Sequence, residues 1–572
     1  MLRAAILLLL WPFRLLAFIY MRLRGLHKAL LIDIHIRSDY SEAPLSHGIW
    51  SYFKPAKDRF YLVSLELGVI LAAIKRGQLK VAQARLTLES HSLGWAQAWE
   101  IRDQIAELGR LGVETRAYLM SDDKLSLFIA SACQHISCPE SSTFDLAPFT
   151  SESLFVQSLL SKLGIRPQFL SVGEFKSAAE IFTRSGMSPA ARKQTEQLIA
   201  DIEGVFFAAL AAKAPALAAK KERRLMSAER AVKLALIDKH CSYAEFTEES
   251  EHGKKFRKTD LYGAQKIANR RAFRLFNFRR LKKIALLVAE GNIIETATSR
   301  PGTINWPDYE SLSETLKSGH YAGVLLRINS PGGSATVSQL LWREWMLATG
   351  RLKSAPAETQ KDSKKEKDNE EVEPIPVFVS QGNVAASGGY YLSATADRIF
   401  ATPVTITGSI GVVGGKFNVA PLLNKWGVSI DRAPKKNPPP VFSPFADFAG
   451  EQKRIIQENM AEIYEQFLRD VALGRNTEIS KIRPHASGRV YSGKSAQQLG
   501  LTDSEGGLSA TLSALRNHLG IPENEAVHVD ILPAVRESLF SRNMLPMGLS
   551  RMVELADFSR PGIFTLDPRF LL

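Results

Sequence analysis

Two turns built from small residues carry serines in positions suited to acyl-transfer chemistry. Ser387 follows an apolar run that begins at Val377, and it stands between two alanines and two glycines. This pattern predicts a strand over 377–380, a turn through Gly382–Asn383, and an apolar helix that begins at the serine and ends near Ala396. Unpaired backbone N–H groups at a helix N-terminus favour negative charge and could stabilise an oxyanion. A serine that merely caps its helix is the alternative interpretation.

The second turn ends an earlier apolar strand. Residues 324–334 read Val-Leu-Leu-Arg-Ile-Asn-Ser-Pro-Gly-Gly-Ser, and a helical pattern follows over 335–345. The bare N–H groups of Gly332 and Gly333 could approach a carbonyl oxygen closely. Taken alone, a Pro-Gly-Gly sequence usually indicates only a turn.

With Thr407-Gly-Ser-Ile-Gly411 added, these motifs resemble the S49 family of serine peptidases. This is the signal peptide peptidase A group, and the long form with two modules is the most similar. The resemblance covers roughly residues 55–515. It implies an α/β fold of two tandem ClpP/crotonase-like βαβ modules that arose by internal duplication. It also implies a homo-oligomer, with a homotetramer suggested, and neither a metal nor a nucleotide cofactor.

A serine hydroxyl is a weak nucleophile and needs a base. None of the eleven histidines lies in a motif that points at Ser387. The resemblance assigns the base to Lys176, within Ser171-Val-Gly-Glu-Phe-Lys-Ser-Ala-Ala-Glu180. Burial among such small and apolar neighbours would lower the pKa of the lysine, so that a neutral amine could accept the proton of Ser387. A surface lysine at a helix start is the alternative.

The remaining roles also follow from the resemblance. Ser409 would hydrogen-bond the Lys176 amine and orient it. Gly333 and Gly388 would supply the N–H groups of an oxyanion hole. Asn329 stands where the family often has Asp, and it is not a member of the dyad.

An internal duplication organises the body of the chain. Residues 86–90 match residues 326–330 with an offset of 240. Residues 127–136 match 390–399 with an offset of 263, and residues 224–238 match 489–503 with an offset of 265. A looser match pairs 65–70 with 289–293, and we expect both segments to be strands that end in a glycine turn. Offset 263 sets Lys124 opposite Ser387 and Pro439 opposite Lys176. Each module therefore lacks half of the dyad, and we expect one site shared between the modules of one chain.

The expected domains follow from this duplication. They are an N-terminal membrane anchor (1–30), a degenerate module with the lysine base (55–250), a basic connector (251–283), a module with the serine nucleophile (284–520) and a C-terminal tail (521–572). Residues 354–374 are almost all polar, have the length by which the offset changes, and are predicted to be a disordered loop. In the first module we expect a strand over 85–88 and a helix over 95–111. In the second we expect a long amphipathic helix over 450–473.

Composition restricts the possible partners. The net charge of +14 comes mainly from residues 254–283, which hold twelve Lys or Arg and one Asp. A solvated helical connector and a patch against anionic lipid both fit this stretch. Nucleic acid is not expected, because no recognition motif accompanies the charge. Three cysteines are too few for a disulfide framework, and their spacing matches no metal signature.

Residues 4–21 are the membrane candidate. This apolar run contains Pro12 and Arg14, and no small-residue cleavage site follows it. It predicts an uncleaved anchor, with an interfacial helix as the alternative. The flanking positive charges favour a cytoplasmic C-terminal side. The resemblance implies instead a catalytic part on the periplasmic side of a bacterial inner membrane, and we adopt that expectation.

The sequence thus predicts a membrane-anchored serine endopeptidase with a Ser/Lys dyad. It would degrade hydrophobic peptides, such as cleaved signal peptides, through an acyl-enzyme. Two alternatives share the fold: a crotonase-like acyl-CoA enzyme, which needs no Ser/Lys dyad, and a non-catalytic membrane scaffold.

Overall fold

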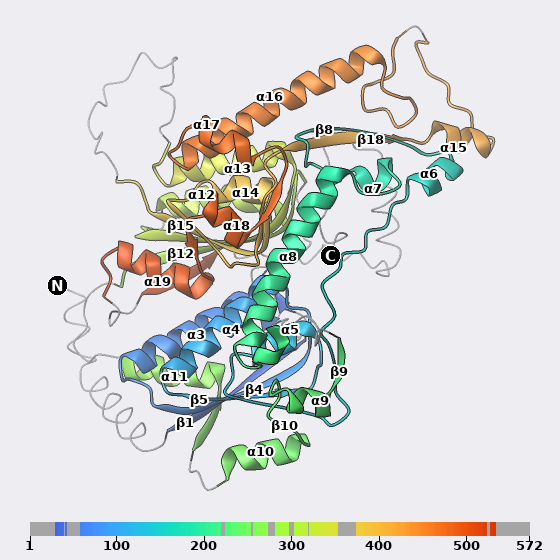
Figure 1. Ribbon diagram of the computed structural model, residues 1–572. Helices are drawn as coiled ribbons and strands as arrows, with labels where there is room; N and C mark the ends of the chain where they lie inside the picture. The colour runs from blue at the N-terminus through green and yellow to red at the C-terminus, as the bar shows by residue number, and fades with distance from the viewer. Residues whose placement is uncertain are drawn as a thin grey trace, which may run out of the picture.

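The computed structural model has two parallel sheets, the lower and the upper in Figure 1, each covered by helices. It describes residues 29–38, 40–42, 58–218, 224–252, 256–272, 281–296, 302–318, 320–352, 373–435, 437–522, 525 and 527–532. The predicted anchor over 4–21, nearly all of the predicted loop over 354–374, and the tail beyond residue 532 lie outside these ranges. None of the helices in the described ranges has both the length and the apolar character needed to cross a bilayer.

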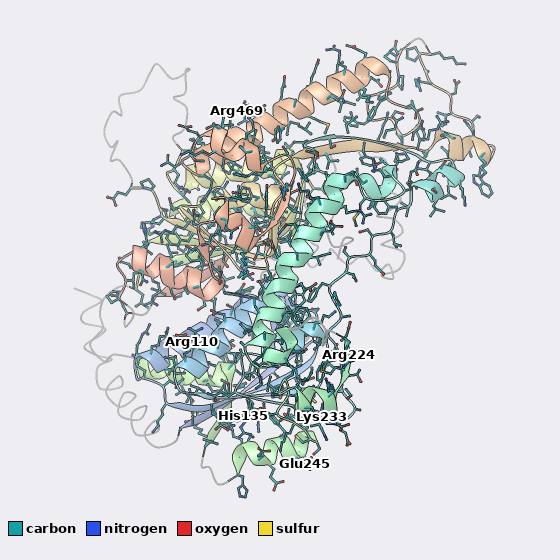
Figure 2. All side chains as sticks on the ribbon, in the orientation of Figure 1. Arg110, His135, Arg224, Lys233, Glu245 and Arg469 are labelled. Carbon is teal, nitrogen blue, oxygen red and sulfur yellow. The ribbon has the colours of Figure 1, made fainter. Side chains whose placement is uncertain are left out.

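The first sheet has six parallel strands in the order β10-β6-β5-β4-β1-β11. Its central strand β4 is buried on both faces over most of its length, which is usual for parallel sheets covered by helices. Side chains fill the space around this sheet, and charged residues such as Arg110 and Glu245 are exposed at its periphery (Figure 2). The strands are β1 (Leu30–Ser38), β4 (Val81–His91), β5 (Glu114–Leu119), β6 (His135–Cys138), β10 (Lys239–His240) and β11 (Arg257–Asp260). The helices of this part are α3 (Phe60–Lys75), α4 (Trp95–Arg110), α5 (Lys124–Ala130), α8 (Pro189–Ala211), α9 (Ala228–Lys233), α10 (Tyr243–Glu251) and α11 (Leu261–Ala272).

The second sheet repeats this order along its parallel path and has nine strands in the described ranges. Its parallel path is β13-β12-β14-β15-β16-β20, and β21 also pairs with β12. The strands are β12 (Lys283–Ile294), β13 (Thr303–Asn305), β14 (Gly323–Gly333), β15 (Val377–Ala386), β16 (Arg398–Ala401), β20 (Ser504–Glu505) and β21 (His528–Leu532). The helices are α12 (Trp306–Ser318), α13 (Ala335–Ala348), α14 (Gly388–Ser393), α16 (Gly450–Gly474), α18 (Gly493–Gln498) and α19 (Leu508–His518).

The predicted duplication into two βαβ modules is confirmed strand by strand. In each module a short antiparallel pair flanks the parallel sheet: β7 (Thr143–Asp145) with β9 (Leu225–Ser227), and β17 (Ile406–Gly408) with β19 (Val490–Ser492). Even single hydrogen bonds repeat. Asp238 accepts the N–H of Ile136 at 2.6 Å, and Asp503 accepts the N–H of Ile399 at 2.7 Å. Both isoleucines and both aspartates lie in segments that the sequence had paired.

Two local predictions were wrong. Residues 65–70 lie in helix α3, and the strand equivalent to β12 is β1, which begins before residue 55. Because α3 is apolar on nearly all sides, its sequence lacks the period that separates a helix from a strand. Gly382–Asn383 are not a turn but lie inside β15. A polar residue is favourable at this position of the strand, because the Oδ1 of Asn383 accepts the N–H groups of Ala96 and Gln97 at the N-terminus of α4.

The alignment between the two modules differs by one residue from the predicted one at Ser387. Helix α14 begins at Gly388 and α5 begins at Lys124, so the residue equivalent to the N-cap Ser387 is Asp123. Asp123 accepts the N–H of Ser126 and therefore caps its helix, whereas Ser387 makes no side-chain capping bond. The sequence had set Lys124 opposite Ser387. The correction leaves the conclusion unchanged, because neither residue is a hydroxyl nucleophile.

An arm joins the two modules. Strand β8 (Arg166–Val172) from the first module pairs antiparallel with β18 (Val412–Asn418) from the second. The short helices α6 (Gln157–Leu163), α7 (Glu180–Thr183) and α15 (Ala420–Lys425) lie around this ribbon, and the long helix α8 runs from the first sheet towards it (Figure 1). Since β8 leads directly into residues 173–179, the arm carries a first-module segment into the second module.

Candidate active site

Three predicted site residues meet where the modules join. The Nζ atom of Lys176 lies 3.0 Å from the Oγ of Ser387, 3.0 Å from the Oγ of Ser409 and 3.0 Å from the carbonyl oxygen of Ser409. Lys176 and Ser387 are 7% exposed and Ser409 is 9% exposed. The base candidate comes from the first module and both serines from the second, all within one chain.

The backbone of Ser387 has an uncommon conformation. Its φ is 53° and its ψ is −117°, on the side of φ that favours glycine. An L-residue holds such a conformation only where its surroundings enforce it, and functional sites are enriched in such residues. Here the enforcement comes from strand β15 before the serine, helix α14 after it, and the N–H of Ser387, which donates to the carbonyl of Gly408 at 2.8 Å.

Ser409 is held in a comparable way. Its φ is 55°. Its N–H donates to the carbonyl oxygen of Arg489 at 2.7 Å, just before β19. The strand β17 that precedes Ser409 pairs with both β15 and β19. The two serines are therefore placed by adjacent strands of one sheet, which fixes the spacing between their hydroxyl groups.

Burial sets the protonation of Lys176. Desolvation lowers the pKa of this amine to about 7, because the charged form loses its hydration in the protein interior. In the part of the chain that the structure describes, no carboxylate forms an ion pair with Lys176 that would oppose this effect. Close to neutral pH a substantial fraction of the amine is therefore uncharged and can accept a proton.

The glycine turns lie beside the serine. A Cβ on Gly332 would fall 2.9 Å from the Cβ of Ser387 and 2.8 Å from the backbone nitrogen of Gly388. The N–H of Gly332 donates to the Oγ of Ser330 at 3.1 Å, so this N–H already has a hydrogen-bond acceptor within the protein. Gly388 is the first residue of α14, where a backbone N–H has no partner inside the helix.

The direction of the Gly333 N–H follows from the hydrogen bonds between β14 and β12. Ser334 donates its N–H to the carbonyl of Ile293 in β12 at 2.8 Å. Successive amides along a strand point to opposite edges, so the N–H of Gly333 is directed away from β12, to the side on which β15 lies. The N–H groups of Gly333 and Gly388 are therefore the candidates for an oxyanion hole beside Ser387.

An apolar pocket opens beside the three residues. Side chains from both modules line it, including Phe155, Ile181, Met187, Leu198, Ile406 and Val490. Lys176, Ser387 and Ser409 also line it. Such an apolar lining suits an apolar side chain. Within the described ranges, no group of three His, Cys, Asp or Glu side chains is arranged to hold a metal ion.

The structure gives a supporting role to Asn329, to which the sequence assigned none, and to Gln194, which the sequence did not single out. Asn329 Oδ1 accepts the N–H of Val384 at 3.1 Å and so braces β15 shortly before Ser387. Only an acceptor is needed there, and the amide oxygen of Asn329 supplies it. Gln194 on α8 contacts segments of both modules beside Lys176. A single glutamine in a helical pattern gives no sequence signal, and only the tertiary structure identifies it.

The sequence profile of peptidase family S49 matches residues 117–257 and 369–521. A chloroplastic serine protease SPPA from Arabidopsis thaliana is 28% identical over 78% of this chain and 64% of its own length. Protease 4 from Haemophilus influenzae is 28% identical over 72% of this chain and 66% of its own length. The chain thus spans about two thirds or slightly less of these relatives. Among solved structures, an enoyl-CoA hydratase/isomerase family protein from Silicibacter pomeroyi is 11% identical over 36% of this chain and 74% of that one, with a TM-score of 0.19.

Proposed function

Because this chain belongs to peptidase family S49, we propose that it is a serine endopeptidase with a Ser387/Lys176 dyad. One observation carries the proposal. The amine of Lys176 lies 3.0 Å from the Ser387 hydroxyl in a buried site that lowers its pKa to about 7. A neutral amine at hydrogen-bond distance is what a general base for this hydroxyl requires.

The proposed reaction begins with transfer of the Ser387 proton to Lys176 as the oxygen attacks a peptide carbonyl. The N–H groups of Gly333 and Gly388 stabilise the oxyanion of the tetrahedral intermediate. Lys176, now protonated, gives its proton to the leaving amine, and an acyl-enzyme on Ser387 remains. A water molecule, deprotonated by the same lysine, then releases the acyl group. Ser409 accepts from the lysine through two oxygens and keeps the amine directed at Ser387.

The proposed substrates are hydrophobic peptides such as cleaved signal peptides. The apolar lining of the pocket beside Ser387 supports this class, since burying an apolar side chain there is favourable. We further propose attachment to a bacterial inner membrane through residues 4–21, a periplasmic catalytic part and a homo-oligomeric, tetrameric assembly. These points rest on the S49 resemblance and the apolar N-terminal run.

A serine-directed fluorophosphonate probe tests the proposed chemistry. It should label the wild-type protein at Ser387, and Ser387→Ala should lose both labelling and hydrolysis of an unstructured peptide while keeping its thermal unfolding temperature. A crotonase-like enzyme or a scaffold would not be labelled there. Peptidase activity that persists in purified Ser387→Ala would refute the assignment.

Co-expression tests whether the dyad belongs to one chain. Mixed oligomers of Ser387→Ala and Lys176→Ala chains should show no more activity than either variant, because each chain then lacks one half of its own site. Recovery of activity well above both parents would mean that the lysine acts on the serine of a neighbouring chain.

A further inference from the structure

A buried glutamine links the base to the opposite module. Gln194 lies on α8, in the first module, and is 7% exposed. Its Nε2 donates to the carbonyl oxygen of Phe175 at 3.2 Å and to the Oγ of Ser177 at 3.0 Å. These two residues flank Lys176 on either side. One amide group therefore holds the segment that carries the base from both ends.

The other half of the same amide faces the second module. Gln194 Oε1 accepts the N–H of Val490 at 3.3 Å, at the start of β19. The preceding residue, Arg489, accepts the N–H of Ser409 through its carbonyl oxygen at 2.7 Å. The chain of contacts thus runs from the backbone around Lys176, through Gln194, to the backbone that holds Ser409.

We propose that Gln194 is a positioning residue for the reaction: its amide fixes segment 175–177 against β19, and thereby keeps the Lys176 amine between Ser387 and Ser409. The inference rests on the function proposed above. A shift of the segment by about 1 Å would lengthen the 3.0 Å contact between Nζ and the Ser387 hydroxyl, and such displacements reduce rates by roughly a hundredfold in other enzymes.

Other titratable groups lie near the lysine segment in the described ranges. Glu180 from α7 lines the pocket, and its carboxylate accepts the N–H of Ser188. The guanidinium of Arg489 stacks over the rings of Phe175 and Tyr491, beside the lysine segment. The hydroxyl of Tyr464 on α16 accepts the N–H of Ser487. None of these contacts involves the amide of Gln194.

The chain offers a matched control on the same helix face. Asp201 lies seven residues after Gln194 and accepts the hydroxyls of Ser492 and Ser495 at 2.5 and 2.7 Å. It therefore also ties α8 to the second module, but away from Lys176. If Gln194 served only to hold the modules together, Asp201→Ala would reproduce its effects.

The experiment measures kcat and KM on one fluorogenic peptide across pH for Gln194→Met, Gln194→Glu and Asp201→Ala, with thermal unfolding of each. In Gln194→Met we expect kcat to fall about tenfold or more with KM little changed. The acid limb of the kcat/KM profile, where this rate constant falls as pH decreases, should move to higher pH. The reason is that a loosened segment admits water and raises the pKa of the Lys176 amine. Gln194→Glu should move the limb further, since a nearby carboxylate favours the protonated amine. Asp201→Ala should unfold at lower temperature and keep the wild-type limb.

Two results would overturn the inference: an unshifted limb in both Gln194 variants, or an equal shift in Asp201→Ala. Should Gln194→Met fail to fold, Ser177→Ala removes one partner of the amide without touching α8, and it should shift the limb in the same direction by a smaller amount. Failure of the proposed function is recognised separately. In that case the wild type itself would lack an acid limb, or would not depend on Ser387.

Discussion

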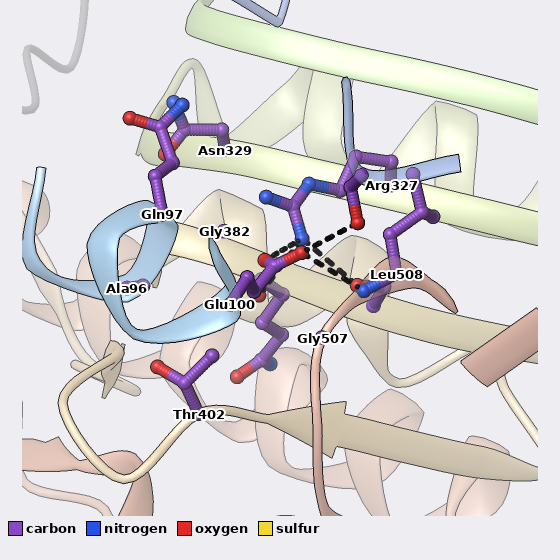
Figure 3. A network of polar contacts seen from close by, with 12 residues as sticks. Ala96, Gln97, Glu100, Arg327, Asn329, Gly382, Thr402, Gly507 and Leu508 are labelled. Atoms are coloured by element: carbon purple, nitrogen blue, oxygen red, sulfur yellow. Dashed lines mark hydrogen bonds and ion pairs between the residues drawn. The ribbon is translucent and has the colours of Figure 1, made fainter. Parts of the chain in front are cut away.

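Arg327 of β14 and Glu100 of α4 form an ion pair of 2.6 Å across the two modules, with both side chains inaccessible or nearly so (Figure 3). A second carboxylate, that of Glu42, lies 2.6 Å from the same guanidinium. Burial alone would lower the pKa of Arg327, but Glu100 and Glu42 outweigh it and raise that pKa, so the guanidinium stays charged. Glu100 also accepts the N–H of Leu508 at 3.1 Å, which ties α19 to the same point.

Arg327→Met should strongly destabilise the protein, because it leaves two buried carboxylates without their cation. The expected loss is about 3–5 kcal/mol in the free energy of unfolding. Arg454→Ala, which removes exposed ion pairs with Glu451 and Glu458 on α16, should change it far less, because solvent screens these charges. Denaturant unfolding of both variants measures the difference. Equal losses would show that the buried network contributes no more than a surface pair.

Peptidase activity should depend on pH through Lys176. The pKa of this amine is lowered to about 7, so above that pH the amine is neutral and can accept the Ser387 proton. Below it, kcat/KM should fall about tenfold for each pH unit, because only the neutral fraction acts as base. Lys176→Arg should be inactive at every pH, since a guanidinium does not deprotonate. A wild-type rate that is constant from pH 8 to pH 5 would contradict the assignment.

Lys176→Met should stabilise the folded protein most at low pH. The unfolded chain binds a proton on this lysine up to its ordinary pKa of 10.5, whereas the folded chain binds it only below about 7. Folding therefore costs on the order of 5 kcal/mol below pH 7, and this cost shrinks to zero as pH rises to the unfolded pKa. The gain from methionine should follow the same curve in unfolding temperature. Lys80→Met, at an exposed position, is the control and should show no such trend.

Gly332→Ala should remove activity while preserving the fold. Its φ of 106° strains an alanine, and the new Cβ would lie 2.8 Å from the Gly388 nitrogen that we propose for the oxyanion hole. We expect kcat to drop about a hundredfold or more. Gly77→Ala is the matched control, because its φ is 66° but nothing lies within 4 Å of an added Cβ. Both variants should lose roughly 1 kcal/mol or more of stability through strain, and only the first should lose activity.

Replacement of residues 354–374 by a short Gly/Ser linker should cost little stability. The N–H of Ile375 donates to the carbonyl of Thr349 at 2.9 Å, so the chain is already closed on both sides of this segment. Loop-closure entropy changes by only about 0.6 kcal/mol for each doubling of length. Thermal unfolding and gel filtration of the shortened protein test this. Loss of folding or of assembly would assign the segment a structural role.

The sequence predicted most strands and helices because each carries a local pattern. The helix at 450–474 and the strand at Val377 were recognisable from periodicity and from an apolar run. The pattern failed in α3, whose apolar residues face a neighbour on nearly every side. It failed again at Asn383, where a polar residue inside a strand satisfies the N-terminus of α4.

The site could be predicted only in part, because sequence patterns report local structure and not contacts between distant segments. Ser387 and the neighbouring glycines could be selected from the sequence, because small residues cluster where backbones approach closely. Lys176 has no distinguishing local pattern, and its selection rested on the S49 resemblance. Arg327 and Gln194 could not have been selected, since their importance lies in contacts with residues far away in the chain.

The separation of Lys176 and Ser387 by 211 positions has a consequence for the timing of synthesis. Ribosomes add about 5–20 residues per second, so under the proposed roles the base is made roughly ten seconds or more before the nucleophile. During that interval the emerging chain holds an amine with no hydroxyl to activate. Cleavage competence arises only when the second sheet has folded against the first. Under the proposed roles, the site is therefore incomplete on the nascent chain until the strands of the second sheet have been synthesised.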